Sequence, residues 1–166
     1  MPRMHVALRV HDVRRSIDFY TAVLGLEPTK VRADYAKFTL ASPPLVLSLS
    51  AAPGRARHSP EGTGALSHLG FQVAGERELA EARERIARAG LGIALDERGV
   101  TCCYAVQNKF WVTDPDGNAW ELYRFVEDAA SSRGADPTAD AGSCCATPSV
   151  SETGACETGT CETGAC

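Results

Sequence analysis

The sequence predicts an α+β fold built from two βαβββ modules, and three observations support this prediction. A strand-like run followed by a helical pattern occurs twice, once from His5 and once from His68. Each helical pattern is followed by short β-rich runs rather than by another helix. Between the two occurrences, residues 51–64 contain two prolines, three glycines and few apolar side chains, which is typical of a linker.

Length and composition favour one domain with a buried core, since the chain has 166 residues and 44% of them are hydrophobic. We place this domain at residues 1–126, with modules at about 4–50 and 66–125. The formal net charge of -4 removes the electrostatic argument for nucleic acid or an anionic membrane as a partner. No apolar run reaches the roughly 18 residues that span a bilayer, and the N-terminus has no signal-peptide core. We therefore expect a soluble cytoplasmic protein, either a monomer or a homodimer.

In the first module, residues 5–10 alternate in polarity and predict a strand. Asp12 is placed to cap a helix, and Gly25 is placed to end it. The apolar positions of this helix follow helical spacing at Val13, Ile17, Tyr20 and Leu24. Three β-rich runs follow, at residues 29–32, 35–40 and 45–50.

The second module restarts at residues 68–73, whose polarity matches that of residues 5–10. Its helix is predicted to bury one face made by Leu79, Ala82, Ile86 and Ala89, before Gly90. Strands are predicted at residues 92–97, 110–112 and 120–125. The segment 114–118 predicts a type I turn, with Pro115 at i+1 and Gly117 at i+3.

Cys102 and Cys103 are adjacent thiols, and adjacent strand residues point to opposite faces. The two can reach one ligand only where the backbone bends, so we place them in a loop or bulge. In a reducing compartment such a pair favours a thiophilic centre such as trivalent arsenic, antimony or cadmium. The alternative is two small hydrophobic side chains packed in a core.

Beyond Phe125 the chain has no aromatic residue and is rich in Ala, Gly, Ser and Thr. We predict that residues 127–166 form a disordered tail, because such a segment buries too little apolar surface to offset its chain entropy. It carries three copies of Glu-Thr-Gly-x-Cys, and its thiols are Cys144, Cys145, Cys156, Cys161 and Cys166. The alternative is a non-essential extension.

His5 and His68 occupy equivalent places at the starts of the two modules, and a two-fold arrangement of the modules would bring them towards a common centre. Glu121 lies within the last predicted strand, where a carboxylate is costly unless it is paired or binds a cation. These three residues would form a two-histidine, one-carboxylate site of the type that holds non-haem Fe(II). The alternatives are structural histidines and an edge-strand charge facing water. His11 and His58 have no matched partner, and we interpret both as structural or solvated.

Aromatic side chains follow the cysteine pair at Tyr104, Phe110 and Trp111. We interpret them as core or as the wall of a pocket, and an aromatic wall would suit an organic substituent on a bound substrate.

The doubled βαβββ plan, with His5, His68 and Glu121 and the turn at 114–118, resembles the vicinal oxygen chelate superfamily of glyoxalases, bleomycin resistance proteins and extradiol dioxygenases. This resemblance covers residues 4–125. Within it, residues 102–107 leading to residues 109–112 look like the organoarsenical carbon-arsenic lyases and the cadmium-induced proteins.

The resemblance implies a vicinal oxygen chelate fold, with Fe(II) bound by His5, His68 and Glu121 and a trivalent organoarsenical held by Cys102 and Cys103. It implies a dioxygen-dependent cleavage of the carbon-arsenic bond of methylarsonous acid or a trivalent aromatic arsenical, releasing arsenite in arsenic detoxification. The tail cysteines are then expected to capture trivalent arsenicals and pass them inward, or to hold the arsenite product.

When Ser42-Pro43 is aligned with Asp114-Pro115, the place equivalent to Glu121 falls at Leu49, with Ser48 beside it. The first module therefore offers no fourth carboxylate, and a four-ligand glyoxalase site is not expected. The alternatives are a protein that binds cadmium or arsenite without turnover, and an extradiol-type dioxygenase with incidental cysteines. A purely thiolate-based scavenger would not require the two histidines and the glutamate.

Overall fold

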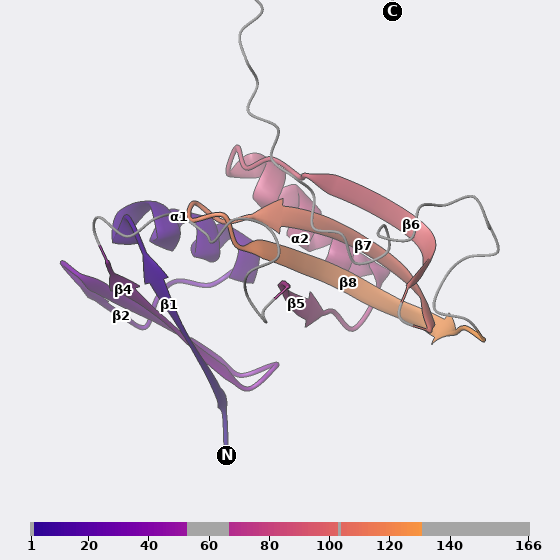
Figure 1. Ribbon diagram of the computed structural model, residues 1–166, viewed down its shortest axis with the longest axis horizontal. Coiled ribbons are helices and arrows are strands. Elements are labelled where there is room, and N and C mark those ends of the chain that lie inside the picture. The colour runs from indigo at the N-terminus through magenta and orange to yellow at the C-terminus, as the bar shows by residue number, and fades with distance from the viewer. Residues whose placement is uncertain (1, 53–66, 103, 131–166) are drawn as a thin grey trace, which may run out of the picture.

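The computed structural model describes residues 2–52, 67–102 and 104–130 (Figure 1). The first module consists of β1 (Met4–Val10), α1 (Val13–Leu24), β2 (Lys30–Arg32), β3 (Tyr35–Leu40) and β4 (Leu45–Ala51). The second consists of β5 (Leu69–Gln72), α2 (Glu76–Arg88), β6 (Leu95–Cys102), β7 (Ala105–Thr113) and β8 (Ala119–Asp128). The predicted α+β order of two βαβββ modules is confirmed.

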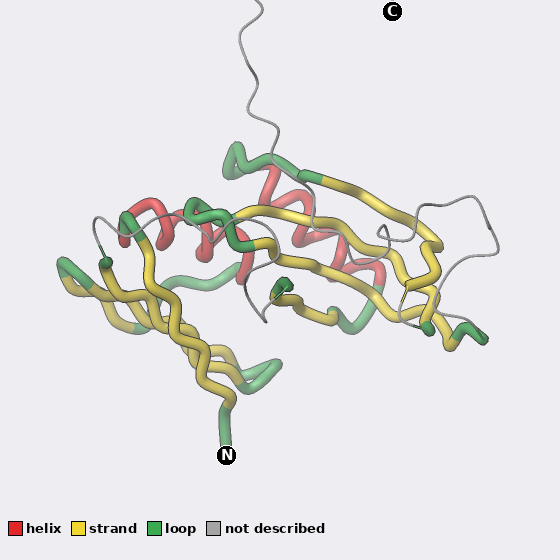
Figure 2. The backbone as a smooth tube through the Cα atoms, in the orientation of Figure 1, coloured by secondary structure: helices red, strands yellow, loops and turns green. Residues whose placement is uncertain are grey.

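The strands of the described residues form two four-stranded sheets, in the orders β1-β4-β3-β2 and β5-β8-β7-β6. In each sheet the first strand pairs in parallel with the last, and the other pairs are antiparallel. Figure 2 shows the strands as two groups with the helices alongside them. Because β1 and β5 are edge strands, the strand that opens each module has one side without a partner in this part of the chain.

Helix α1 begins and ends where its local chemistry predicts. The Asp12 carboxylate accepts hydrogen bonds from the amides of Arg14 at 2.9 Å and Arg15 at 3.1 Å. Gly25 follows in the left-handed conformation, with φ 71°, and its amide donates to the Thr21 carbonyl. The N-cap and the C-terminal glycine predicted from sequence are therefore both confirmed.

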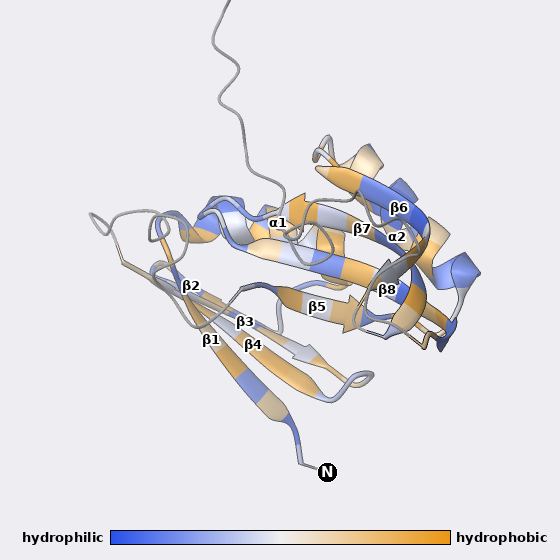
Figure 3. Ribbon diagram, turned by 45° about the vertical axis from the view of Figure 1, so that its right-hand side comes forward, coloured by the Kyte–Doolittle hydropathy of each residue, from blue (hydrophilic) through white to orange (hydrophobic). Residues whose placement is uncertain are grey.

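The core lies on one face of each sheet and includes both helices. Strand β3 alternates between half-buried and buried residues, and its buried side chains are Ala36, Phe38 and Leu40. Figure 3 shows this alternation as changes of hydropathy along the strands. Side chains from both modules join in one hydrophobic cluster, so the modules share a core. Neither helix of the described chain has the length and apolar character needed to cross a membrane.

Helix α2 buries Leu79, Ala82 and Ile86, as predicted, but not Ala89. Ala89 is the exposed residue that follows the end of the helix at Arg88. The prediction extended the apolar face one turn too far. Ala89 has the spacing in sequence that a residue of this face would have, but the helix ends before it.

The β6–β7 hairpin differs from its prediction. β6 starts three residues later than predicted and runs through Cys102, so Cys102 lies in a strand rather than in a loop or bulge. It pairs with Ala105, and the chain reverses between these two residues, with Tyr104 in a left-handed conformation at φ 64°. The bulge of this hairpin lies earlier, between Glu97 and Val100. The prediction of a loop or bulge at Cys102 is therefore wrong, and the residue of this turn in a left-handed conformation is Tyr104.

The turn that leads into β8 is held by the Asp114 side chain. Its carboxylate accepts hydrogen bonds from the amides of Asp116 at 3.0 Å and Asn118 at 2.8 Å. It also accepts the Tyr20 hydroxyl at 2.6 Å. The Gly117 amide donates to the Asp114 carbonyl at 3.0 Å, as expected for the predicted type I turn. The turn is thereby tied to α1, which fixes where β8 begins.

Several predictions fall on residues outside the described ranges. These are Cys103, His58 and most of the linker, and residues 131–166 with all five tail cysteines. At the start of the segment predicted as tail, β8 continues to Asp128.

Candidate active site

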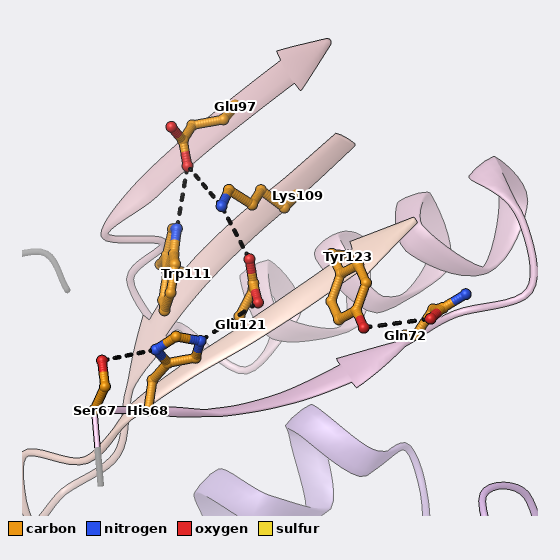
Figure 4. A network of polar contacts seen from close by, with 8 residues as sticks. All are labelled: Ser67, His68, Gln72, Glu97, Lys109, Trp111, Glu121 and Tyr123. Carbon is orange, nitrogen blue, oxygen red and sulfur yellow. Dashed lines mark hydrogen bonds and ion pairs between the residues drawn. The ribbon is translucent and has the colours of Figure 1, made fainter. Parts of the chain in front are cut away.

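The candidate site lies on the face of the second sheet opposite the shared core. Strand register places Gly70, Glu121 and Trp111 side by side on β5, β8 and β7. Two residues along each strand, Gln72, Tyr123 and Lys109 form the next row. Figure 4 shows these polar side chains gathered on one side of the strands.

His68 and Glu121 form the centre of this face. His68 Nε2 lies 3.7 Å from Glu121 Oε2, although the histidine precedes β5 and the glutamate is in β8. The other ring nitrogen, Nδ1, is 3.0 Å from the Ser67 hydroxyl, which fixes the ring orientation. The edge-to-face contact with the Trp111 ring, with 4.9 Å between centroids, supports the same orientation.

Lys109 is the cation of the site, and its side chain is 1% exposed. Its Nζ lies 3.0 Å from Glu121 Oε1 and 3.9 Å from Glu97 Oε2. Burial alone would lower the pKa of Lys109, but the hydrogen bond and charge of Glu121, with contributions from Cys102 and Glu97, raise it above its usual value. Lys109 therefore remains a buried ammonium paired with carboxylates.

A glycine leaves space in front of the carboxylate. A Cβ added to Gly70 would lie 3.2 Å from the Glu121 carbonyl oxygen and 3.5 Å from Glu121 Oε2. Any larger side chain on β5 would therefore stand beside the carboxylate oxygen that faces His68. The absence of a side chain keeps this oxygen approachable.

Cys102 joins the site face through strand pairing. It pairs with Ala105 at the end of β6, and Ala105 lies on the same side of β7 as Lys109. Its side chain is buried, at 2% exposure, and its charge contributes to the raised pKa of Lys109. A thiol and a histidine-carboxylate pair thus share one face of one sheet.

The aromatic residues predicted as core or pocket wall separate into three environments. Trp111 lies in the site, against His68, and donates from Nε1 to Glu97 at 3.2 Å. Phe110 points to the opposite face and is fully buried in the hydrophobic core. Tyr104 is 62% exposed and lines no part of the described site. Of the three, only Trp111 can serve as a wall here.

The fold of this chain matches that of a known superfamily of proteins. Residues 4–122 match the glyoxalase/bleomycin resistance protein/dioxygenase superfamily. The chain belongs to this superfamily. Among superfamily structures, a glyoxalase/bleomycin resistance protein/dioxygenase from Alicyclobacillus acidocaldarius superposes with a TM-score of 0.61 at 16% identity, covering 76% of this chain and 92% of that one. This likeness shows the shared fold.

Two curated relatives are much more similar in sequence. The trivalent organoarsenical cleaving enzyme of Thermomonospora curvata is 40% identical over 148 residues, covering 89% of this chain and 90% of that protein. The cadmium-induced protein CadI of Mycobacterium bovis is 39% identical over 129 residues, covering 78% of this chain and 80% of that protein. The resemblance identified from the sequence to these two kinds of protein is confirmed.

His5, the third predicted ligand, lies away from the other two predicted ligands, His68 and Glu121. It is exposed on β1 of the first sheet, where its Nε2 is 3.0 Å from the Ser48 hydroxyl. The described residues contain no group of three or more His, Cys, Asp or Glu side chains placed to hold one metal ion. The structure thus brings together His68 and Glu121, but not His5.

The strand register corrects the prediction of which residue in the first module is equivalent to Glu121. Ala7 pairs with Ser48 two positions after His5, just as Gly70 pairs with Glu121 two positions after His68. The equivalent residue is therefore Ser48, and the predicted Leu49 is wrong, since Leu49 faces the core. The conclusion that the first module lacks a carboxylate here is unchanged. A difference of one residue moves a strand side chain to the other face.

Sequence reasoning missed Lys109 and Glu97 as members of the site. Lys109 alternates with Trp111 on a strand that is otherwise buried, so a charged residue there needs a partner. That signal could have identified Lys109. Its partners lie on two other strands and become visible only with the register. The backbone amide of His11 donates to Asp116 at 2.8 Å, a bond that does not involve the ring, so the interpretation of this histidine as structural or solvated stays a prediction.

Proposed function

We propose that this chain cleaves the carbon-arsenic bond of trivalent organoarsenicals, using Fe(II) and dioxygen, and releases arsenite. The observation that carries the proposal is the histidine-carboxylate pair, His68 and Glu121, on the same sheet face as the Cys102 thiol. The similarity to the organoarsenical cleaving enzyme supports it. Methylarsonous acid and trivalent aromatic arsenicals are the proposed substrates, and cytoplasmic arsenic detoxification is the proposed setting.

His68 and Glu121 are donors of the kinds that Fe(II) takes in proteins. His68 Nε2 and Glu121 Oε2 face each other at 3.7 Å, and Gly70 leaves their front open. Two ligands on one first-row metal ion lie roughly 3 to 3.5 Å apart, so the pair needs little movement to share an ion. Two histidines and one carboxylate suit Fe(II) and leave positions open, where the bound metal would supply dioxygen activation.

His5 of a second copy is the third ligand in this proposal. Among the described residues, β1 and β5 are edge strands, and His5 and His68 lie at or beside their first residues. A two-fold dimer that sets β1 of one copy beside β5 of the other brings an exposed His5 towards His68 and Glu121. The proposed enzyme is therefore a homodimer whose sites are shared between copies.

Cys102, with Cys103, binds the arsenic in this mechanism. Two thiolates hold trivalent arsenic much better than one, because the second attachment is intramolecular. Held at the tip of the β6–β7 hairpin, the arsenic keeps its carbon substituent over the sheet face that carries Glu121. The Trp111 ring offers this substituent an apolar wall beside His68. For the methyl compound the atoms balance: methylarsonous acid and one dioxygen give arsenous acid and formaldehyde.

Turnover by the reconstituted protein tests the proposal. The full chain is loaded anaerobically with Fe(II), then given methylarsonous acid and air, and arsenite is measured by speciation and formaldehyde by derivatisation. We expect both products from wild type and neither from Cys102→Ser, Cys103→Ser or Glu121→Gln. His11→Ala, outside the site, is the matched control and should retain activity.

The same measurement separates the alternatives. Binding of cadmium or arsenite with no arsenite released from methylarsonous acid would identify a metal-sequestering protein. Turnover that is equally fast in Cys102→Ser and wild type would identify a dioxygenase in which the cysteines are incidental. Either result would refute the proposed carbon-arsenic cleavage.

A further inference from the structure

Lys109 is a buried cation in the centre of the site, and the reaction described above assigns it no part. A lysine side chain at 1% exposure is costly unless its charge is paired. Its ammonium group meets carboxylates on two neighbouring strands, Glu97 on β6 and Glu121 on β8. Lys109 therefore pairs with the carboxylate that the proposed metal requires.

The two oxygens of Glu121 have different neighbours. Oε1 lies 3.0 Å from Lys109 Nζ, and Oε2 lies 3.7 Å from His68 Nε2. We infer that Lys109 is a positioning residue, which holds Glu121 by Oε1 so that Oε2 alone is presented to a metal beside His68. The inference rests on the proposed metal site and deepens it, because it specifies one-oxygen coordination by Glu121.

A second line of contacts connects Lys109 to the other ligand. Its Nζ lies 5.3 Å from the centre of the Trp111 ring, and that ring packs edge-to-face on His68. Glu97 accepts a hydrogen bond from Trp111 at 3.2 Å and lies 3.9 Å from Lys109 Nζ. Figure 4 shows these side chains as one connected group. Lys109 thus supports Glu121 directly and His68 through Trp111.

The same cation faces the thiol. Cys102 lies on the Lys109 side of the β6–β7 ladder, near enough to interact with its charge. The positive charge of Lys109 therefore lies close to both the Glu121 carboxylate and the Cys102 side chain. Removing it would leave Glu121 buried, with both oxygens free to turn or to bind a metal together.

Cobalt(II) binding to the full-length protein tests this inference without turnover. Visible absorption of Co(II) reports both affinity and coordination geometry, and is compared among wild type, Lys109→Met, Lys109→Arg and Lys30→Met. Supporting residues behind a metal ligand typically change metal affinity about tenfold or more. We expect Lys109→Met to bind Co(II) at least about tenfold more weakly and with a changed spectrum.

The other two variants are controls for Lys109→Met. Lys109→Arg retains charge and N–H donors, and should recover part of the affinity. Lys30→Met removes an exposed lysine of the first sheet and should match wild type. Thermal melting confirms folding. If Lys109→Met does not fold, Lys109→Arg is used in its place. The longer, planar guanidinium of arginine must displace the Glu121 carboxylate and so alter the Co(II) spectrum.

The inference would be overturned if a folded Lys109→Met protein bound Co(II) with the affinity and spectrum of wild type. If Lys109→Met does not fold, the same result for Lys109→Arg would overturn it. In either case the proposed function would be unaffected. Failure of wild type to bind Co(II) at all would overturn the metal site, and with it both proposals. The two failures are therefore distinguishable in one titration series.

Discussion

The side chain of His5 contacts Ser48 in the first sheet, and the side chain of His68 contacts Glu121 at the equivalent position of the second sheet. The first pair is separated by 3.0 Å between Nε2 and Oγ, and the second by 3.7 Å between Nε2 and Oε2. Both pairs connect the start of a module to the strand that pairs with it in parallel. The modules therefore repeat the histidine but not the anion, and only the second can provide a negatively charged ligand.

Mixing two inactive variants tests whether His5 acts in a second copy. His5→Ala and His68→Ala should each abolish turnover, because each removes a proposed ligand. After co-refolding of the two, half the dimers are mixed and one of their two sites is intact, so about a quarter of wild-type activity should return. Continued inactivity of the mixture, with mixed dimers demonstrated by mass spectrometry, would place His5 in the same chain's site.

Gly70→Ala should disturb Glu121. The added Cβ would approach the Glu121 carbonyl oxygen to 3.2 Å, which requires β5 or β8 to shift by a few tenths of an ångström. We expect Co(II) affinity to fall severalfold while unfolding free energy changes by about 1 kcal/mol or less. Gly92→Ala is the control, since nothing lies within 4 Å of its Cβ position. Equal effects of the two substitutions would exclude a local action on the carboxylate.

Tyr20 should make the fold sensitive to alkali. Burial, and then the charge and hydrogen bond of Asp114, raise the pKa of Tyr20 above its usual value. Its contribution to stability is therefore complete below about pH 10, where unfolded tyrosine titrates, and is lost as pH rises further. Between pH 10 and 11, wild type should lose up to about 1.4 kcal/mol more than Tyr20→Phe in urea unfolding.

Tyr20→Phe should also lower stability at neutral pH by about 1 to 3 kcal/mol, because Trp120 Nε1, which lies 3.1 Å from the hydroxyl, loses its acceptor. A parallel pH dependence of the two proteins above pH 10 would contradict the assignment.

Arg85 should contribute to joining the two helices. From α2, its guanidinium donates to the carbonyls of Ala22 at 2.8 Å and Val23 at 3.0 Å, at the C-terminal end of α1. Arg85→Met should therefore lower the unfolding free energy by about 1 to 3 kcal/mol. Arg88→Met, at an exposed position of the same helix, should change it by less than about 0.5 kcal/mol. Equal melting curves would show that the contact is dispensable.

Truncation after Ala130 tests the predicted capture of arsenicals by the tail. If the five tail thiols raise the local concentration of substrate, truncation should raise KM severalfold and leave kcat unchanged. Replacing the five cysteines by serine in the full chain is the matched control and should reproduce the effect. Unchanged turnover at low substrate concentration would show that the tail is not involved.

Local patterns predicted the elements well, because their signals lie within a few residues of one another. Asp12 and Gly25 bound α1 through hydrogen bonds to their own neighbours, and alternation in β3 identified its buried face. The register between strands was not predictable in this way. Ser48 rather than Leu49 faces His5 because β1 and β4 pair at one particular offset, which depends on the packing of the whole module.

Part of the candidate site could be predicted from the sequence, but the contacts that support its residues could not. His68 and Glu121 were identifiable from residue type and from the repeat. Lys109 was not assigned, because its partners lie on β6 and β8, 12 residues away on either side along the chain. Cys102 was expected in a loop because adjacent strand residues diverge. In the structure Cys102 instead ends strand β6, where it pairs with Ala105.

The β6–β7–β8 ladder connects the thiol to the carboxylate without any intervening loop or flexible linker. Cys102 pairs with Ala105, and six residues along β7 Trp111 pairs with Glu121, so hydrogen-bonded backbone sets the spacing of the two groups. The paired strands thus hold the two groups at a set separation along the strand direction. Six residues of β7 span roughly 20 Å, so a substituent as short as a methyl group reaches the histidine-carboxylate pair only if the end of the hairpin that carries Cys102 bends towards it.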